Sequence, residues 1–236
     1  MAQKPIANKI PKELVSNNHK RIDNYYWMNQ RDSAEVLEYI SQENKYCENY
    51  FKPLSPLVDE LMQEFEERID PNEEGAPFIL NKRIYQAKSE EGLEYQKIFV
   101  QEKDKEQLFF DQNERAKGNS YYDLADWEPS PDNKLLAVAE DFVGRRKNTI
   151  SIRKNKNGKY LKDRIEDSNG DIIWSNDNKA IYYIKKDEQT LREYQVFRHI
   201  IGKNAKEDEL IYQEDDEKYS VSFGKSKTGK YIFIAC

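Results

Sequence analysis

The sequence predicts a mainly β fold, an incomplete β-propeller of about three to three and a half blades preceded by an α-helical N-terminal arm. Three observations predict it. Apolar residues recur at helical spacing before Pro71, and beyond it they alternate with polar residues as they do in strands. Turn and strand markers then repeat at intervals of about 48 residues, and a period of ~40–50 residues with several strands is typical of propeller blades.

The composition indicates an ordered chain with a thin core. Lys and Arg total 38 and Asp and Glu total 44 among the 236 residues, so the net charge is −6 and the charged fraction is 35%. High charge with few apolar residues is typical of disordered chains, but such chains lack aromatic residues. Here aromatic residues make up 12% of the chain and lie in alternating runs, which favours a folded protein.

Charge, apolar runs and cysteines exclude several classes of protein. A negative net charge of mixed sign argues against a nucleic-acid partner. No run approaches the ~18 apolar residues of a membrane helix, and the start, MAQKPIANKIPKEL, has no signal-peptide core, so no membrane partner is expected. Cys47 and Cys236 are too few for a disulfide framework and fit a reducing compartment, which predicts a cytoplasmic protein.

Two helices are predicted in the arm. The first has Asp32 as its expected N-cap, with Glu35 completing a capping box, and it ends at Pro53. Residues 55–56, Ser-Pro, start the second helix, because proline is favoured in the first helical turn. Residues 70–71, Asp-Pro, are expected to stop it.

The chain is predicted to divide into an arm over residues 1–71, a linker over 72–77 and a partial propeller over 78–236. After the linker, short runs rich in Tyr, Ile, Val and Phe are separated by Asn, Asp, Gly and Lys, which are strand and hairpin signals. The clearest runs are residues 83–87, 95–100, 135–140, 149–153, 181–186, 194–200 and 231–235.

The strands repeat along the sequence. Similar turns at residues 130–134, 175–179 and 226–230 each precede an apolar strand. An aromatic residue stands shortly before each turn, namely Trp127, Trp174 and Phe223. A four-stranded blade cannot bury both faces alone, so such units stack on their neighbours. The alternative is an ordinary β-sandwich with coincidental turns.

The propeller is expected to be truncated. A closed propeller needs at least four blades, and about three and a half fit after residue 78. The last residues, KYIFIAC, read as an unfinished strand, as in a fragment of a longer protein.

The residues assign no catalytic site. Residues 224–230 match G-x-x-x-x-G-K, but Tyr231 follows where a phosphate-binding loop needs Ser or Thr, so we expect a hairpin turn. No G-x-S-x-G turn precedes a helix. His19 lies in a polar segment, and His199 is expected to pack or hydrogen-bond on a strand, so no serine triad can be assembled.

Charged clusters leave two interpretations open. The acidic runs at 207–209 and 214–217 are either solvated turns or weak cation sites, and zinc would need Cys and His at closer spacing. Arg145 and Arg146, which follow a strand, either clamp a carboxylate from another domain or mark an exposed hairpin end. No cofactor and no metal are expected.

From about residue 21 onward the chain resembles the N-terminal part of the oligopeptidase B (protease II) enzymes of the prolyl oligopeptidase family of serine peptidases. The matching stretches lie at residues 22–44, 60–69, 136–146, 172–187 and 196–227. The opening IDNYYW and the later RHIIG and DELIYQEDD are fairly specific, and their relative spacing holds. The chain departs from the family at residues 81–85, NKRIY, which leaves the local shape of the first strand open.

The resemblance implies a function larger than this segment. In the family, a seven-bladed propeller caps a C-terminal α/β-hydrolase domain that holds the Ser, Asp and His and cleaves short peptides after Lys or Arg. The segment itself would then be inactive, with short basic peptides and the hydrolase domain as its partners. By analogy, Arg145 or Arg146 is a candidate inter-domain ion-pair partner. The candidate hinge consists of Ile69, Asp70, Pro71, Asn72 and Glu73. The alternative function is a stand-alone propeller that binds a partner or serves as a scaffold.

Overall fold

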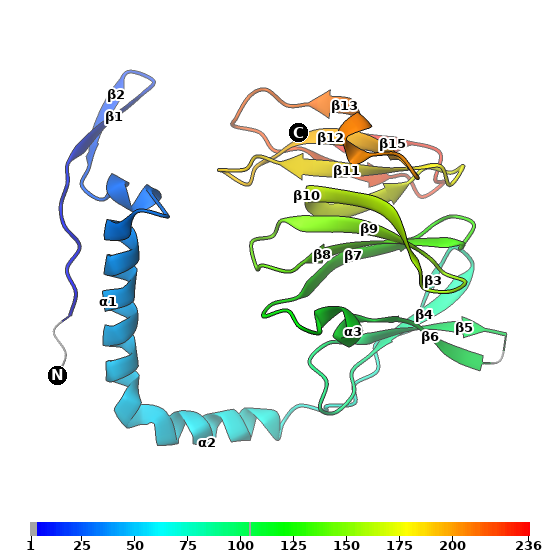
Figure 1. The fold of residues 1–236 in the computed structure, drawn as a ribbon, viewed down its shortest axis with the longest axis horizontal. Helices are drawn as coiled ribbons and strands as arrows, with labels where there is room; N and C mark the ends of the chain where they lie inside the picture. Colours follow the sequence, from blue (N-terminus) through cyan, green and yellow to red (C-terminus); the bar gives the residue numbers. More distant parts are fainter. Residues whose placement is uncertain (1–3, 104) are drawn as a thin grey trace. The chain divides into compact units, whose positions relative to one another are not determined.

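The computed structural model describes residues 4–103 and 105–236. The chain forms two compact units, which divide between Asp70 and Pro71. The first unit is mainly helical and the second is mainly β, so the predicted order of a helical arm followed by β structure is confirmed (Figure 1).

The arm begins with a hairpin that sequence reasoning missed. Strands β1 (Lys12–Ser16) and β2 (His19–Asp23) pair around Asn17 and Asn18, which both have positive φ angles. Two consecutive residues of that conformation form the two-residue turn favoured in hairpins, and Asn tolerates it well. The polar composition of both strands concealed them, because neither has the alternating apolar pattern that predicts a strand.

Two helices follow the hairpin, as predicted, with different ends. A short 3-10 turn, η1 (Tyr26–Asn29), precedes α1 (Ala34–Phe51), and η2 (Lys52–Leu54) leads into α2 (Ser55–Glu66). The predicted N-cap, Asp32, is wrong. The Ser33 hydroxyl accepts the Val36 N–H at 3.3 Å, because Ser33 has the extended backbone that an N-cap requires. With Ser33 as the cap, Val36 occupies the third helical position, so no capping box forms.

Helix α2 also ends earlier than predicted. Its last residue is Glu66, and a turn in which the Ile69 N–H donates to the Glu66 carbonyl replaces the predicted stop at residues 70–71. Both helices carry apolar side chains that this unit leaves exposed. On α2 these include Leu57, Leu61 and Phe65.

The second unit is built from antiparallel strands. The first sheet has the order β3-β4-β5-β6, and a second sheet runs β7 to β13 in chain order, followed by the hairpin β14-β15. The strands of the first sheet are β3 (Phe78–Leu80), β4 (Arg83–Lys88), β5 (Lys97–Glu102) and β6 (Lys105–Asp111). Helix α3 (Gln112–Ala116) connects it to β7 (Asp123–Pro129), β8 (Leu135–Asp141) and β9 (Asn148–Lys154). The remaining strands are β10 (Tyr160–Trp174), β11 (Ala180–Lys186), β12 (Glu193–Ile200), β13 (Glu209–Gln213), β14 (Ser222–Lys225) and β15 (Ile232–Ala235).

Strand β10 belongs to two sheet modules at once. Its first part, up to Ser168, pairs with β9, and its last part, from Ser168 to Trp174, pairs with β11. We therefore describe the second sheet as two four-stranded modules that share β10, so that β3–β6, β7–β10 and β10–β13 are modules 1, 2 and 3. The hairpin β14-β15 begins the next module. Gly170 permits the bend, since its φ is 114° and an added Cβ would lie 2.8 Å from the Ala125 Cβ.

Successive modules pack face to face through separate apolar clusters. Tyr85, Ile98 and Phe110 of module 1 meet Leu136 and Val138 of module 2. The opposite face of module 2 packs on module 3, through a cluster that includes Ala137, Ile150, Ile152, Ile181 and Tyr183. A third cluster, Ile184, Val196 and Val221, joins module 3 to the β14-β15 hairpin. Module 2 is thus covered on both faces, which excludes a two-layer sandwich and confirms the predicted propeller repeat.

The predicted turns occupy equivalent places in successive modules and contact one another. The Asn178 side chain accepts the Asp132 N–H at 2.8 Å, and the Asn176 side chain donates to the Gly229 carbonyl at 2.8 Å. All seven runs predicted as strands overlap strands, although residues 95–96 precede β5 and Tyr231 precedes β15. Residues 224–230 form the end of β14 and a turn into β15, so the expected hairpin is confirmed and no phosphate-binding loop exists there.

Candidate functional site

Alternate connections of the β unit gather at opposite ends of its strands. Consecutive strands are antiparallel, and β10 reverses direction at its bend, so the connections alternate between the two ends when this bend is counted as one of them. We call the end at which β3 begins the linker rim, and its connections are residues 89–96, 112–122, 142–147, 187–192 and 214–221. The opposite end, the turn rim, holds the repeated turns. The predicted arginine pair, Arg145 and Arg146, lies on the linker rim, in the loop between β8 and β9.

A buried carboxylate organises this arginine loop. Asp141, which is 2% exposed, accepts the N–H groups of Val143 at 2.9 Å, Gly144 at 3.0 Å and Arg146 at 2.7 Å. Three donors converging on one ionised group form strong, charge-assisted hydrogen bonds. The carboxylate therefore fixes the path of the loop from within.

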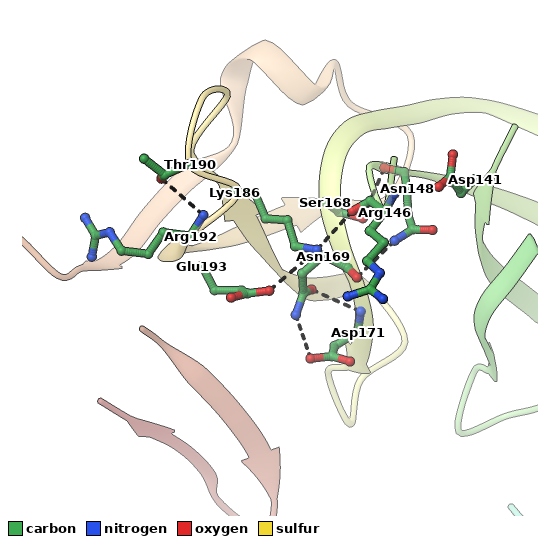
Figure 2. A network of polar contacts seen from close by, with 10 residues as sticks. All are labelled: Asp141, Arg146, Asn148, Ser168, Asn169, Asp171, Lys186, Thr190, Arg192 and Glu193. Carbon is green, nitrogen blue, oxygen red and sulfur yellow. Dashed lines mark hydrogen bonds and ion pairs between the residues drawn. The ribbon is translucent and has the colours of Figure 1, made fainter. Parts of the chain in front are cut away.

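A lysine from the next module holds the same loop from its other side. The Lys186 ammonium on β11 donates to the Arg146 carbonyl at 2.9 Å and lies 3.5 Å from the Glu193 carboxylate on β12 (Figure 2). The Lys186 side chain is only 8% exposed. The loop of module 2 is thus attached to module 3 through a largely buried charge.

Both guanidinium groups of the arginine pair lie free at the surface. Arg145 and Arg146 are exposed, and neither side chain forms an ion pair or hydrogen bond with any residue that the structure describes. Their neighbour Lys147 instead faces the Asp167 carboxylate at 3.5 Å. A guanidinium presents several donors in a planar fork that suits a carboxylate, so the chemistry of both side chains is compatible with binding one.

Beside the arginine loop, polar contacts fix the bend of β10. Buried Asn148 donates from its side chain to the Asn169 carbonyl at 2.9 Å, and the Ser168 hydroxyl donates to the Asn148 carbonyl at 3.2 Å. The Asn169 side chain in turn donates to the Asp171 carboxylate at 2.7 Å (Figure 2). These contacts give the arginine loop a rigid support on module 2.

The candidate hinge residues have different environments. Ile69 and Asp70 belong to the arm unit, and Pro71 begins the β unit. Asn72 accepts the Glu91 N–H at 3.1 Å through its side chain, and the Glu73 carbonyl accepts the Ser89 N–H at 2.9 Å. The beginning of the predicted linker is therefore bonded to the segment that follows β4.

Two carboxyl groups on β7, the first strand of module 2, are partly buried. Burial raises the pKa of Asp126 to about 6, although its carboxylate accepts the Ile172 N–H at 3.1 Å. Burial and the neighbouring Asp126 raise the pKa of Glu128 to about 7. The Lys225 ammonium, whose pKa burial lowers, donates to the Trp174 carbonyl at 2.8 Å. These groups connect β7, the last part of β10 and β14, which are the first strands of three successive modules.

Neither histidine is placed to serve as a catalytic base. His199 is fully buried, its Nδ1 lies 2.7 Å from the Asp208 carboxylate, and its Nε2 lies 2.9 Å from the Asp163 carboxylate. This confirms the expectation that His199 is a hydrogen-bonding residue. His19 is exposed on β2. Since these are the only two histidines of the sequence, no Ser-His-acid triad is present within residues 4–103 and 105–236.

The described residues contain no candidate metal cluster and no candidate membrane-spanning helix. No group of three or more His, Cys, Asp or Glu suited to hold a metal occurs in the part of the chain that the structure describes. Within the same ranges, no helix has the length and apolar content to span a bilayer.

Sequence reasoning found the arginine pair but missed the residues that support it. Asp141 carries a recognisable local signal, because an Asp shortly before a glycine commonly caps the N–H groups of a turn. Lys186 carries no such signal, since only the folded structure brings it to Arg146 from 40 positions away.

Comparison with known proteins gives consistent results. A family model described as the N-terminal β-propeller domain of prolyl oligopeptidase matches residues 5–236. The chain is 31% identical over 256 residues to dipeptidyl aminopeptidase BI of Pseudoxanthomonas mexicana, covering 100% of this chain and 35% of that protein. It is 28% identical over 241 residues to Protease 2 of Moraxella lacunata, covering 98% of this chain and 35% of that protein.

A solved structure agrees in fold. The structure of oligopeptidase B from Leishmania major superposes with a TM-score of 0.91 at 27% identity, covering 99% of this chain and 36% of that chain. The chain therefore spans about a third of the length of the relatives it matches.

Proposed function

The chain belongs to the prolyl oligopeptidase family and corresponds to its N-terminal β-propeller domain, and from this premise we propose that it is the gating portion of a serine-type oligopeptidase. The observation that supports the proposal is that the chain matches the propeller domain of the family, whereas its described residues contain no catalytic triad. The chain matches only the first third of its relatives, and the described residues contain no serine triad. It therefore supplies the arm and the propeller, and it is non-catalytic by itself.

The proposed partner is a C-terminal α/β-hydrolase domain of the same protein. The apolar side chains of Leu57, Leu61 and Phe65 on α2 support this proposal, because each is at least 40% exposed in the arm unit. Contiguous exposed apolar side chains of this size mark a surface that another protein surface covers. The arm would then pack on the hydrolase domain, while the propeller restricts access to the catalytic serine.

The proposed substrates are short peptides cleaved after Lys or Arg. The net charge of −6 favours cationic substrates. The name of the Pseudoxanthomonas mexicana relative indicates release of dipeptides as the competing specificity. Folded proteins are expected to be poor substrates, since a propeller admits only narrow chains.

Opening and closing would occur about the segment Ile69, Asp70, Pro71, Asn72 and Glu73. The division of the two compact units between Asp70 and Pro71 supports a pivot there. The bonds of Asn72 and Glu73 to residues 89–91 favour motion on the N-terminal side of these two residues. In the closed state, Arg145 or Arg146 would bind a carboxylate of the hydrolase domain.

We propose that the protein is located in the cytoplasm, which is a reducing compartment. Cys47 and Cys236 are both unpaired and exposed, which is typical of proteins kept in thiol-reducing surroundings.

The test uses the full-length gene product and three chromogenic reporters of equal length, with Arg, Ala or Pro before the reporter group. A fourth reporter carries a free N-terminal dipeptide. We expect the Arg reporter to have the highest kcat/KM, and a folded protein rich in surface Arg to remain uncut. Preference for the dipeptide or Pro reporter would overturn the basic specificity. A gene product without a downstream G-x-S-x-G and later Asp and His would overturn the peptidase function itself.

A further inference from the structure

The turn rim carries an excess of positive charge, although the chain as a whole is acidic. The connections of this rim that the structure describes in full are residues 81–82, 130–134, 155–159, 175–179, 201–208 and 226–231. These residues include nine lysines and no arginine, against four carboxylates. The five connecting loops of the linker rim have the opposite balance, with seven basic and ten acidic residues. The two ends of the strands therefore favour ligands of opposite charge.

The repeat of the modules places these lysines at equivalent positions. A lysine ends each turn between the first and second strands of successive modules, namely Lys82, Lys134, Lys179 and Lys230. The turn between the third and fourth strands of module 2 adds Lys156 and Lys159. All six residues are exposed. The stacking of the modules thus gathers one kind of charge at one end of the strands.

A cleft of about 780 Å³ opens between modules 1 and 2 at this rim. Arg83, Glu102 and Gln107 line it from module 1, and residues 132–135 and 154–156 line it from module 2. Small-molecule sites have volumes of roughly 300–1,000 Å³, so the cleft is large enough to hold a small ligand. We call it the turn-rim cleft.

The free positive charge of the turn-rim cleft comes from Lys154 and Lys156. The Arg83 guanidinium is compensated by the Glu102 carboxylate at 3.0 Å. The Lys134 ammonium likewise lies 3.0 Å from a carboxylate of its own turn. Lys154 and Lys156 are exposed, and neither ammonium group forms an ion pair or hydrogen bond with any residue that the structure describes. The cleft therefore contains two cations that lack a counter-charge.

Amide side chains give the turn-rim cleft a rigid wall. The Asn155 side chain donates to the carbonyl of Asn133 at 2.9 Å and to that of Leu135 at 3.2 Å. Asn178, from module 3, accepts the Asp132 N–H at 2.8 Å through its side-chain oxygen. The NH₂ group of Asn178 has no partner among the described residues, so it is available to an oxygen of a ligand. A donor that is held in place before binding loses less conformational entropy when the ligand binds.

We propose that the turn-rim cleft binds a small anion that carries at least two phosphate groups. Ammonium groups bind phosphate as point charges, whereas the planar fork of a guanidinium is the better match for a carboxylate. The Arg83 guanidinium of the cleft is already occupied by Glu102. No aromatic side chain is present among the described residues that line the cleft, so the site does not favour a nucleobase, which stacks on such side chains.

This anion site goes beyond the proposed gating function and does not depend on it. The turn-rim cleft lies at the opposite end of the strands from Arg145 and Arg146, and the net charge of its rim is opposite to that of the cationic peptides proposed as substrates. An anion in the cleft would contact modules 1 and 2 together. Because it binds the folded protein, it would raise the stability of the β unit in proportion to its occupancy.

The experiment is isothermal titration calorimetry of the full-length gene product with inorganic pyrophosphate, at about 0.1 M salt, where exposed charges more than ~10 Å apart are largely screened. We expect saturable binding and a Tm that rises with the pyrophosphate concentration. A variant with Lys154→Gln and Lys156→Gln is expected to bind at least about tenfold more weakly, because it loses charge-assisted hydrogen bonds to the anion. The matched control has Lys203→Gln and Lys206→Gln, which remove the same charge from a turn of this rim outside the cleft, and its affinity should stay within about twofold of the wild type.

Three results would overturn this assignment. Absence of pyrophosphate binding to the wild type at millimolar concentration would show that the cleft is not an anion site. Equal weakening in the two lysine variants would show that the rim attracts anions without a specific site. Equal or tighter binding of citrate, a compact polycarboxylate, would overturn the choice of phosphate. Both variants replace exposed side chains, so without ligand their Tm should match that of the wild type, and a change in affinity then reports on binding alone.

Discussion

The indole N–H of Trp174 donates a hydrogen bond to the backbone carbonyl of Glu128, at a distance of 2.8 Å. Trp174 ends β10 and Glu128 follows Trp127 on β7, so the bond joins equivalent strands of two successive modules. The strands that carry the repeated aromatic residues of the sequence are therefore in direct contact.

Trp174→Phe is expected to lower the free energy of unfolding by about 1–3 kcal/mol, because the Glu128 carbonyl loses its donor in a buried place. Trp127→Phe is the matched control, since its indole nitrogen has no hydrogen-bond partner among the described residues and its ring contacts survive in part. Urea unfolding followed by circular dichroism measures both. An equal decrease in the free energy of unfolding of the two variants would show that the inter-module hydrogen bond does not contribute to stability.

Asp141→Asn is expected to destabilise the β unit by about 1–3 kcal/mol, because an amide cannot supply the same charged acceptor to three N–H groups. Hydrogen exchange of the Val143, Gly144 and Arg146 amides is the direct readout. We expect faster exchange at these three amides while exchange within β12 stays unchanged. Unchanged exchange in the loop would contradict the assigned role of the carboxylate.

His199→Ala is expected to lower the free energy of unfolding by about 3–5 kcal/mol, because it leaves the buried carboxylates of Asp163 and Asp208 without their shared partner. His19→Ala, at an exposed position, should change stability by less than about 0.5 kcal/mol. Thermal unfolding measures both variants. A mild effect at His199 would mean that this cluster does not hold β10, β12 and the start of β13 together.

The stability of the protein should fall as pH rises through neutrality, and Glu128 should contribute to that fall. The pKa of its carboxyl is raised from 4.5 to about 7 by burial and by Asp126, so the folded state binds the proton more tightly than the unfolded state does. The resulting stabilisation is complete below pH ~4.5 and is lost as pH rises through ~7, with a size on the order of 1–3 kcal/mol.

Glu128→Gln is expected to remove the pH dependence of stability that Glu128 contributes, because the glutamine side chain does not titrate. The Tm of the variant minus that of the wild type should therefore increase between pH 5 and pH 8. Glu91→Gln, in the exposed loop after β4, serves as the matched control and should show a flat difference. A flat difference for Glu128→Gln as well would contradict the buried environment assigned to this carboxyl.

Much of the propeller could be predicted from sequence because its middle strands are short apolar runs bounded by turn residues, continuous in β8 and β11 and alternating with polar residues in β9. Strands β8, β9 and β11 pack on a neighbouring module and are correspondingly rich in Ile, Val and Ala. The bend of β10 could not be predicted in this way. Residues 167–171, Asp-Ser-Asn-Gly-Asp, have the composition of a turn, yet one strand passes through them because Gly170 and Asp167 adopt positive φ angles.

The candidate site was predictable only in part, for a different physical reason. Arg145 and Arg146 stand out as adjacent cations after a strand, and the structure places both on the linker rim. Which of them is held in place depends on Lys186, which reaches the loop from another module. Such a contact depends on the stacking of modules, and a local sequence pattern does not contain it.

We propose that the chain gates a serine peptidase whose catalytic residues lie outside it. The most direct measurement labels the full-length gene product with a serine-reactive fluorophosphonate and locates the label by mass spectrometry of tryptic peptides. We predict one labelled serine, C-terminal to residue 236, whose labelling abolishes cleavage of the Arg reporter. A stoichiometric label on a serine within residues 1–236, with loss of activity, would contradict this account.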